Sequence, residues 1–325
     1  MDLTPSGALR RGICALTVAA TVPYLTLKSL WLCGSTVGFA PGAEIADSGA
    51  LWAGNLVTFV MDAVAVLLAL ALIRPWGRRI PSGLLLFPAW VGSGMLGALL
   101  LELPLVFGTE LLFGTEPSID AQSWLRPWVF AVVYGGFAVQ GLTLLAGFGL
   151  HARERWAGLL ADRIGDLPRT ATLGLQRVLA VTAAGLAVPL AATRLYWALG
   201  GDLARPLRLT EGHRPARIID AVTAALLLAA CGAFLHVVLR RTPERPLAPA
   251  LVTGWVAGGA VFAWGSWTVF AWLLTPEVPE QADVVPPAGQ LAEAAQAGVG
   301  LLLLVLGALI LIERAHAAAD VQSAG

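Results

Sequence analysis

The sequence predicts an all-α integral membrane protein with eight transmembrane helices, arranged as a tandem 4+4 parallel repeat. Of its 325 residues, 57% are hydrophobic and only 13% are charged, and the mean hydropathy is +0.75. A soluble domain carries roughly a quarter charged residues. Apolar segments of the roughly 20 residues needed to cross a bilayer recur along the chain and predict the spans. Similar motifs in the two halves predict the repeat.

The predicted spans follow one another along the chain, separated by segments such as RPWGRRIP and RRTPERP that are rich in Pro and charge. The first apolar run has a basic start, like a signal peptide. It continues to about residue 36 without a clear small-residue cleavage site, so we interpret it as the first span. The spans are predicted over residues 12–36, 51–73, 82–107, 127–150, 174–199, 216–239, 248–274 and 291–312.

Arginines alternate between the connecting segments and predict the orientation. One set of segments carries most of them, and the opposite set carries only Arg126, Arg205, Arg208, Arg214 and Arg217. The positive-inside rule then predicts a multi-pass plasma-membrane protein with both termini in the cytoplasm. The predicted outer loop 200–215 fits this rule least, because several of these arginines lie in it or beside it.

The segment HARERWAGLLADRIGDLP, between the fourth and fifth spans, predicts an interfacial helix. Its apolar residues fall on one helix face, namely Trp156, Leu159, Leu160, Ile164 and Leu167. A plain surface connector is the alternative. The chain therefore divides into a first four-helix repeat over 1–150, a cytoplasmic interfacial linker helix over 151–173 and a second four-helix repeat over 174–325.

The first and fifth spans share the pattern P-x4-[K/R]-x2-W-x2-G, in PYLTLKSLWLCG and PLAATRLYWALG. The next pair of spans shares Asp-Ala-Val at Asp62 and Asp220, and the third pair shares Trp-Val-x-Gly at Trp90 and Trp255. Copies with an even number of spans have the same orientation and are related by an axis along the membrane normal. This predicts a site between the halves, and a duplicated structural scaffold is the alternative.

Polar residues within the spans are the candidate site. Lys28 is the only lysine of the chain, and it shares one predicted helix face with five other residues that carry a polar atom, namely Thr17, Thr21, Tyr24, Trp31 and Ser35. Such a face belongs against protein or water rather than lipid tails. The second half keeps only the cation and the tryptophan of this stripe, as Arg194 and Trp197. At 1.5 Å per residue, both cations lie in the outer part of the membrane.

Asp62 and Glu102 are the candidate anionic partners of Lys28. An ionisable residue within a span indicates a function, although a buried ion pair that only fixes the helices is the alternative. Asp220 carries less weight, since Arg217 beside it indicates the headgroup level. The predicted ligand-binding or intramembrane polar cluster comprises Lys28, Trp31, Tyr24, Asn55, Asp62, Trp90, Glu102, Arg194 and Trp197.

Several kinds of site and partner are excluded by the sequence. The three cysteines form no CxxC pair, and the histidines lie at segment ends or in loops rather than as a pair at matching depth for haem. There is no DxxD-type or His-rich set, so no cofactor, metal site or catalytic residue is predicted. The zero net charge and the lack of a basic tail argue against nucleic acid.

The composition of the chain is distinctive, because arginine nearly replaces lysine and Ala, Gly and Leu are used heavily. Two short segments add to this pattern, namely PYLTLKSLW and RPWGRRIP. The chain resembles the uncharacterised multi-pass membrane proteins of high-GC actinobacteria. This resemblance implies a plasma-membrane location and no activity.

Three functions are open to such a chain. The first is transport or binding of a small anionic or amphipathic ligand between the two repeats, with Lys28 and Arg194 attracting an anionic group. The second is a non-catalytic membrane subunit or regulatory scaffold, favoured by the short loops. The third is a membrane-embedded enzyme acting on a lipid or isoprenoid, although no catalytic set favours an enzyme. The expected partners are the lipid bilayer and a small molecule or another membrane protein.

Overall fold

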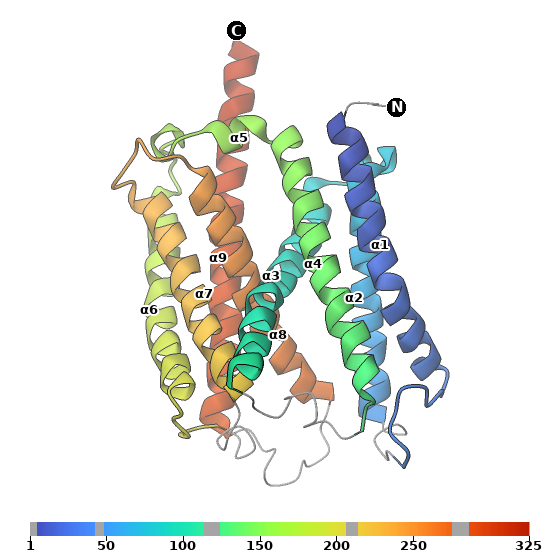
Figure 1. Cartoon of the computed structure of the whole chain (residues 1–325). Helices are drawn as coiled ribbons and strands as arrows, with labels where there is room; N and C mark the ends of the chain where they lie inside the picture. Colours follow the sequence, from blue (N-terminus) through green and yellow to red (C-terminus); the bar gives the residue numbers. More distant parts are fainter. Residues whose placement is uncertain (1–4, 43–48, 114–123, 206–213, 275–285, 325) are drawn as a thin grey trace. The chain divides into compact units, whose positions relative to one another are not determined.

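The computed structural model describes residues 5–42, 49–113, 124–205, 214–274 and 286–324. These residues form long helices (Figure 1), which confirms the predicted all-α class. Eight of the described helices are long and apolar enough to cross a membrane, so the chain is a multi-pass membrane protein. These helices are α1 (Pro5–Leu32), α2 (Gly49–Ile73), α3 (Ser82–Phe113), α4 (Pro127–Arg155), α6 (Leu173–Ala198), α7 (Arg214–Leu239), α8 (Ala248–Leu274) and α9 (Pro287–Ala324).

The predicted spans agree with these helices to within a few residues at most ends. The first span begins and ends earlier than predicted, because α1 starts at Pro5 and stops at Leu32, after which the chain reverses through Gly34, whose φ is +83°. Glycine adopts this left-handed conformation without the steric cost that other residues meet. α3 is longer than predicted and reaches Phe113, with Pro88 and Pro104 inside it.

Contacts between Cα atoms divide the chain into two compact units. The first unit holds residues 1–152 and therefore α1 to α4, and the second holds most of the chain from Arg153 onward. Two short pieces group with the first unit, namely residues 214–215 and 270–274.

In the first unit, α1 is the helix that ties its neighbours together. It packs along α2, and the Thr17 hydroxyl on α1 lies 2.9 Å from the Thr143 hydroxyl on α4. One turn before Thr17, Cys14 packs closely against Gly147 of α4 and joins a small core with Ala69 and other residues of α2. α1 therefore contacts both the second and the last long helix of its unit.

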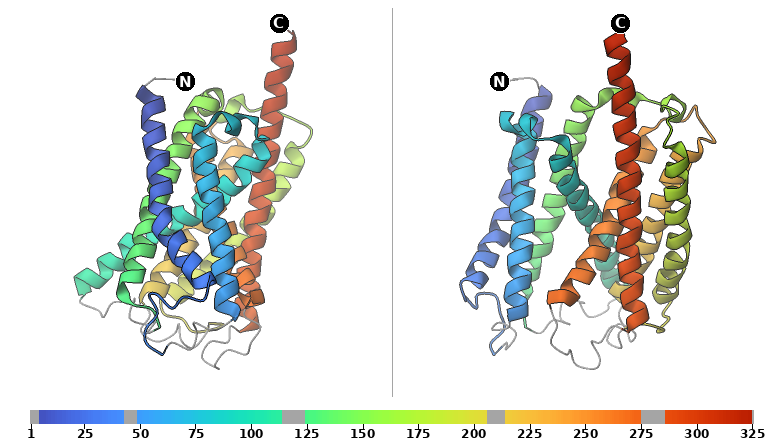
Figure 2. Two further views of the ribbon diagram at one scale, coloured as in Figure 1. Left: turned by 90° about the vertical axis from the view of Figure 1, so that its right-hand side faces the viewer. Right: turned by 180° about the vertical axis from the view of Figure 1, so that it is seen from behind.

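In the second unit, α6 has the same role. It packs along α9, and its alanines join residues of α7, α8 and α9 in one buried core. Figures 1 and 2 show α6, α7 and α9 running side by side. The approach of α8 and α9 needs a glycine, because a Cβ added at Gly300 would lie 2.5 Å from the Cα atom of Phe262.

The linker does not form the predicted continuous helix. After α4 come a five-residue helix, α5 (Ala157–Ala161), and a three-residue 3-10 turn, η4 (Ile164–Asp166). The amide groups of Ile164 and Gly165 donate to the carbonyl oxygens of Arg245 and Pro243 in the α7–α8 connection. Ile164 is fully buried in the core of the second unit. Backbone pairing and burial thus replace the surface helix that the apolar spacing predicted.

Candidate functional site

The first unit buries an ion pair between α1 and α2. Lys28 is fully buried, and its Nζ atom lies 2.6 Å from Oδ2 of Asp62, one of its two predicted partners. The same Nζ atom lies 3.8 Å from the ring centroid of Tyr24, one turn earlier on α1. The side chain of Gln140 on α4 also hydrogen bonds Asp62. The ammonium is therefore enclosed by a carboxylate and an aromatic face, both of which favour a cation.

The polar stripe of α1 faces protein along most of its length. Thr17 and Thr21 are buried like Lys28, and each hydroxyl donates to the carbonyl oxygen four residues earlier. Such bonds satisfy hydroxyl groups inside a helix. Ser35 does not belong to the stripe, because α1 ends before it. Its Oγ atom instead accepts a hydrogen bond from the amide of Val37.

Trp31 fixes the turn that follows α1. Its indole Nε1 donates to the carbonyl oxygen of Val37, six residues further on, at 2.7 Å. Phe39 is buried against the Trp31 ring and also stacks on Trp124, at the start of the segment that leads into α4. Trp31 therefore contributes to the site by folding a turn next to the ion pair.

Three other members of the predicted cluster have different surroundings. Asn55 is half-buried on α2, and its carbonyl oxygen accepts from the Thr58 hydroxyl. Trp90 is buried on α3, with its ring 6.3 Å from that of Phe87. Glu102 is buried on α3 and has no ion pair or hydrogen bond with another described residue. The structure thus brings together Lys28, Asp62 and Tyr24, with Gln140 as an unpredicted fourth group.

The second unit places Arg194 in a larger cluster between α6, α7 and α9. Its guanidinium lies 3.0 Å from Asp220 and 2.6 Å from Glu293, and it donates to Oε1 of Gln296 at 2.8 Å. The amide of Gln296 donates in turn to the carbonyl oxygen of Val261 on α8. All four long helices of the unit therefore meet at this cluster.

Arg205 adds a second cation to the cluster from the turn after α6. One of its Nη atoms lies 2.6 Å from Asp220, and the other donates to the carbonyl oxygen of Trp197. Burial lowers the pKa of Arg205, and the nearby Asp220 carboxylate opposes that effect. Asp220 is thus a buried carboxylate shared by two arginines, not the peripheral residue that Arg217 suggested.

The turns that follow α1 and α6 share the tryptophan hydrogen bond and several backbone hydrogen bonds. Trp197 donates to the carbonyl oxygen of Leu203, six residues further on, as Trp31 does to Val37. Gly200 has a φ of +99° at the position that Gly34 occupies in the first turn. The amides of the two glycines and of the residues after them donate to matching carbonyl oxygens of α1 and α6. In this alignment Arg205 stands where the first turn has Phe39.

Sequence reasoning missed Gln140, Arg205, Glu293 and Gln296. The sequence indicated Gln140 and Gln296 only weakly, since they occur in the corresponding fourth and eighth spans. In the structure both are buried beside an ion cluster. Glu293 lies three residues before Gln296 on α9, one turn away on the same face. Arg205 had no such signal, because only the fold of its turn brings it to Asp220.

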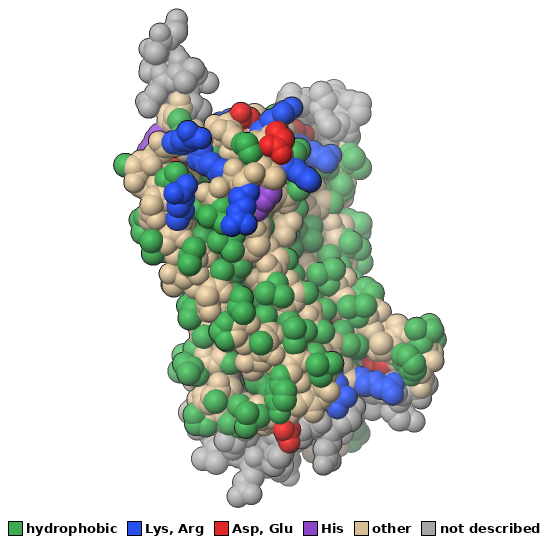
Figure 3. All heavy atoms as spheres, turned by 90° about the vertical axis from the view of Figure 1, so that its left-hand side faces the viewer, with side chains coloured by type: hydrophobic (Ala, Val, Ile, Leu, Met, Phe, Trp, Pro, Cys, Tyr) green, Lys and Arg blue, Asp and Glu red, His purple; other side chains and the backbone are tan. Residues whose placement is uncertain are grey.

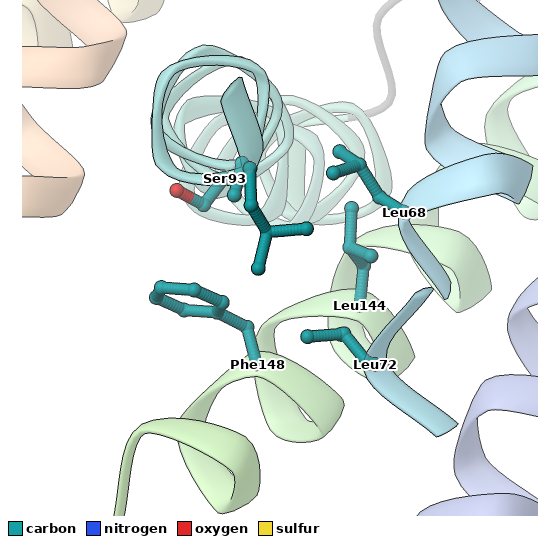
Figure 4. Close-up of a pocket in the computed structure, with 7 residues that line it drawn as sticks. Leu68, Leu72, Ser93, Leu144 and Phe148 are labelled. Atoms are coloured by element: carbon teal, nitrogen blue, oxygen red, sulfur yellow. The ribbon is translucent and has the colours of Figure 1, made fainter. Parts of the chain in front are cut away.

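A small cavity lies in the first unit, away from the ion pair. It is lined almost entirely by apolar side chains of α2, α3 and α4 and has a volume of about 10 Å³ (Figure 4). A cavity of this size holds about one water molecule. Its one hydroxyl, on Ser93, is bonded to the carbonyl oxygen of Trp90. The lining residues are Leu68, Leu72, Leu85, Ala89, Ser93, Leu144 and Phe148, none of which belongs to the predicted cluster.

Within the described part of the chain, no group of three or more His, Cys, Asp or Glu side chains is placed to hold a metal ion. Comparisons with known protein families, with curated proteins and with solved structures found no match. The two ion clusters and their surroundings are therefore the features of this chain that bear on its function.

Proposed function

We propose that this chain is a non-catalytic membrane protein, a subunit or scaffold, in which the two ion clusters hold the helices of each unit in register. One observation carries the proposal. Both intramembrane cations, Lys28 and Arg194, are paired with carboxylates of their own unit at 2.6–3.0 Å. An anionic ligand would first have to displace Asp62 or Asp220, so these cations are poorly suited to capture one.

We also propose that the two units are copies of one four-helix ancestor. Several correspondences support this. Each unit has a cation and a tryptophan at the same spacing on its first long helix, and an aspartate on the second pairs with that cation. Each also has a buried glutamine on its last long helix that bonds a member of the pair. A duplicated scaffold explains why both copies keep the pair although its residues differ.

The orientation and setting follow from the arginine distribution. We place the protein in the plasma membrane with both termini in the cytoplasm, because the connecting segments on that side carry most of the arginines. Its partners would be the surrounding lipid and, for a subunit or scaffold, another membrane protein.

A double-mutant cycle on Lys28 and Asp62 tests the structural role. Removing one member of a buried ion pair leaves an uncompensated charge and costs about 3–5 kcal/mol, whereas replacing both by apolar residues is often neutral. Lys28→Met and Asp62→Leu should each lower the thermal unfolding temperature in detergent. The double variant should recover most of the loss. Additive losses in the double variant would contradict the proposal.

A second candidate is binding or transport of a small amphipathic ligand. Glu102 favours it, because this buried carboxyl group has no partner among the described residues and would suit the amine of such a ligand. The test is thermal stabilisation by a panel of amphipathic amines. Stabilisation in the wild type that is lost in Glu102→Gln, but kept in the matched variant Glu110→Gln on the same helix, would favour this function over a scaffold.

A further inference from the structure

We infer that the second unit carries a binding site for the phosphate of an anionic lipid headgroup, formed by Arg169, Arg177 and Arg240. These residues gather where α6 begins and α7 ends. Arg169 precedes α6, Arg177 lies in its second turn, and Arg240 directly follows α7. Figure 3 shows basic side chains collected at the end of the molecule that carries the start of α6. The site is separate from the ion clusters and does not depend on the proposed function.

Arg169 and Arg177 lie near enough to Arg240 for their charges to act on it. The pKa of Arg240 is lowered by burial and then by the positive charges of Arg169 and Arg177, and it is raised by Glu313. Three cations therefore face one carboxylate. Arg169 and Arg177 have no ion pair with any described residue, and both are exposed. The cluster thus has an excess of positive charge in a small region, which favours an anion.

Glu313 is already occupied by other donors. The hydroxyls of Thr170 and Thr172 donate to its carboxylate, and the side-chain amide of Gln176 donates to it at 2.7 Å. These bonds hold the carboxylate against the start of α6. Because its oxygens accept from neutral groups, Glu313 lowers the local charge without capturing any of the three guanidinium groups.

Arg240 is fixed in a way that a generic surface arginine is not. Its two Nη atoms donate to the carbonyl oxygens of Leu167 and Pro168, both at 2.7 Å. Its backbone has a φ of +50°, a conformation that residues other than glycine rarely adopt. Its Nε atom is buried and has no acceptor among the described residues. Arg240 therefore adds positive charge to the site, and the exposed Arg169 and Arg177 are the groups that a headgroup phosphate can contact.

The position of the cluster selects a lipid as the source of the phosphate. It lies where the apolar spans α6 and α7 end, which is the level of the headgroups. On α6 beside Arg177, Leu175 and Val178 expose 51% and 62% of their surface. A lipid fits both features, since its phosphate meets the arginines and its acyl chains cover the exposed side chains. Basic pockets at the ends of transmembrane helices recognise headgroups in this manner.

The test measures lipid binding to the purified full chain. The probe is phosphatidylglycerol, with phosphatidylcholine of the same acyl chains as the neutral reference, and the readout is the affinity for fluorescent lipid in detergent micelles. The variant Arg169→Gln with Arg177→Gln leaves the Arg240 contacts intact, so folding is preserved. The matched control is Arg74→Gln with Arg79→Gln in the first unit, which removes the same charge from two exposed arginines.

We expect the Arg169/Arg177 double variant to bind phosphatidylglycerol roughly 25-fold more weakly, since each arginine near an anionic surface contributes roughly fivefold to the affinity. The control should change affinity by less than about threefold, and phosphatidylcholine binding should not change. Equal losses in both double variants would show general charge attraction and overturn the site. Inorganic phosphate that binds as tightly as the lipid, and competes with it, would overturn the lipid assignment.

Discussion

In the first unit one ammonium and one carboxylate form the intramembrane ion pair, whereas in the second unit two guanidinium groups share two carboxylates and a glutamine. The number of donors on each cation explains the difference. An ammonium is a compact charge that one carboxylate and one aromatic face can satisfy, but a guanidinium presents five N–H donors in a fixed fork. The cation at this position of the helix therefore determines how many helices must supply acceptors.

The turns after α1 and α6 show the same relation. Both are closed by a tryptophan that donates to a carbonyl oxygen six residues ahead, and both reverse at a glycine with positive φ. The first turn then ends in Phe39, which stacks on aromatic rings, while the second ends in Arg205, which reaches Asp220. One backbone design thus carries an apolar contact in one unit and an ionic contact in the other.

The largest effect is expected from Asp220→Asn. This change leaves Arg194 and Arg205 without their shared carboxylate and should reduce the free energy of unfolding by about 3–5 kcal/mol, more than Asp62→Asn, which affects one cation. Thermal unfolding of the purified protein measures both. Asp202→Asn, at an exposed position, is the control and should change little. A larger loss at Asp62 than at Asp220 would reverse the comparison between the units.

An exchange of the cations comes next. Lys28→Arg adds volume and donors to a fully buried site and should cost about 1–3 kcal/mol of stability. Arg194→Lys should also destabilise, because one ammonium cannot reproduce the guanidinium contacts to Asp220, Glu293 and Gln296. Chemical or thermal unfolding of each variant gives the cost. If neither exchange changed the stability, the surroundings of Lys28 and Arg194 would not be matched to the cation that each holds.

A smaller loss is expected at the reversing glycines. Gly34→Ala and Gly200→Ala each place a Cβ atom on a residue with positive φ, which costs about 1–2 kcal/mol. The loss should be greater at Gly200, where the new Cβ would lie 3.0 Å from the Arg217 side chain, than at Gly34, where the space is open. Unfolding temperatures of the two variants test this order. Gly12→Ala, in an open helical position, is the matched control.

The smallest effect concerns the tryptophan hydrogen bonds. Trp31→Phe and Trp197→Phe keep an aromatic ring but remove the N–H donor, and a typical hydrogen bond contributes about 0.5–1.5 kcal/mol. Trp197 is buried and Trp31 is half-buried, so the loss should be greater at Trp197. Hydrogen exchange of the amides in the two turns measures the effect locally. Equal protection in both variants and the wild type would show that these bonds do not hold the turns.

Much of the fold could be predicted because the spans depend on local properties. Hydropathy and length are properties of each segment alone, so the helices were placed correctly to within a few residues at most ends. The linker prediction failed for the opposite reason. Ile164 and Leu167 have the spacing of an interfacial helix, but distant residues of the α7–α8 connection pair with this segment and bury both side chains.

The candidate site was predictable only where the two halves share a motif, or where the helix rise gives the depth of a charged residue in the membrane. The pairing of Lys28 with Asp62 was predicted from their similar depth, estimated from the helix rise, and from the rarity of charged residues in apolar spans. Glu102 met the same criteria and has no described partner, because equal depth does not make two helices neighbours. The proposed duplication could have raised the weight of Asp220, since it matches Asp62 in the motif that the two spans share.

The sequence by itself determined that the chain crosses the membrane with eight apolar helices, and which helix positions carry charge. It did so because a bilayer imposes a length and a polarity on every segment separately. Only the tertiary structure decided which charges meet. Arg205 reaches Asp220 through a reversed turn, and Glu293 and Gln296 reach Arg194 from a helix that lies about a hundred residues later in the chain. Such contacts depend on how helices pack and how turns reverse, and neither is encoded in the hydropathy of a single segment.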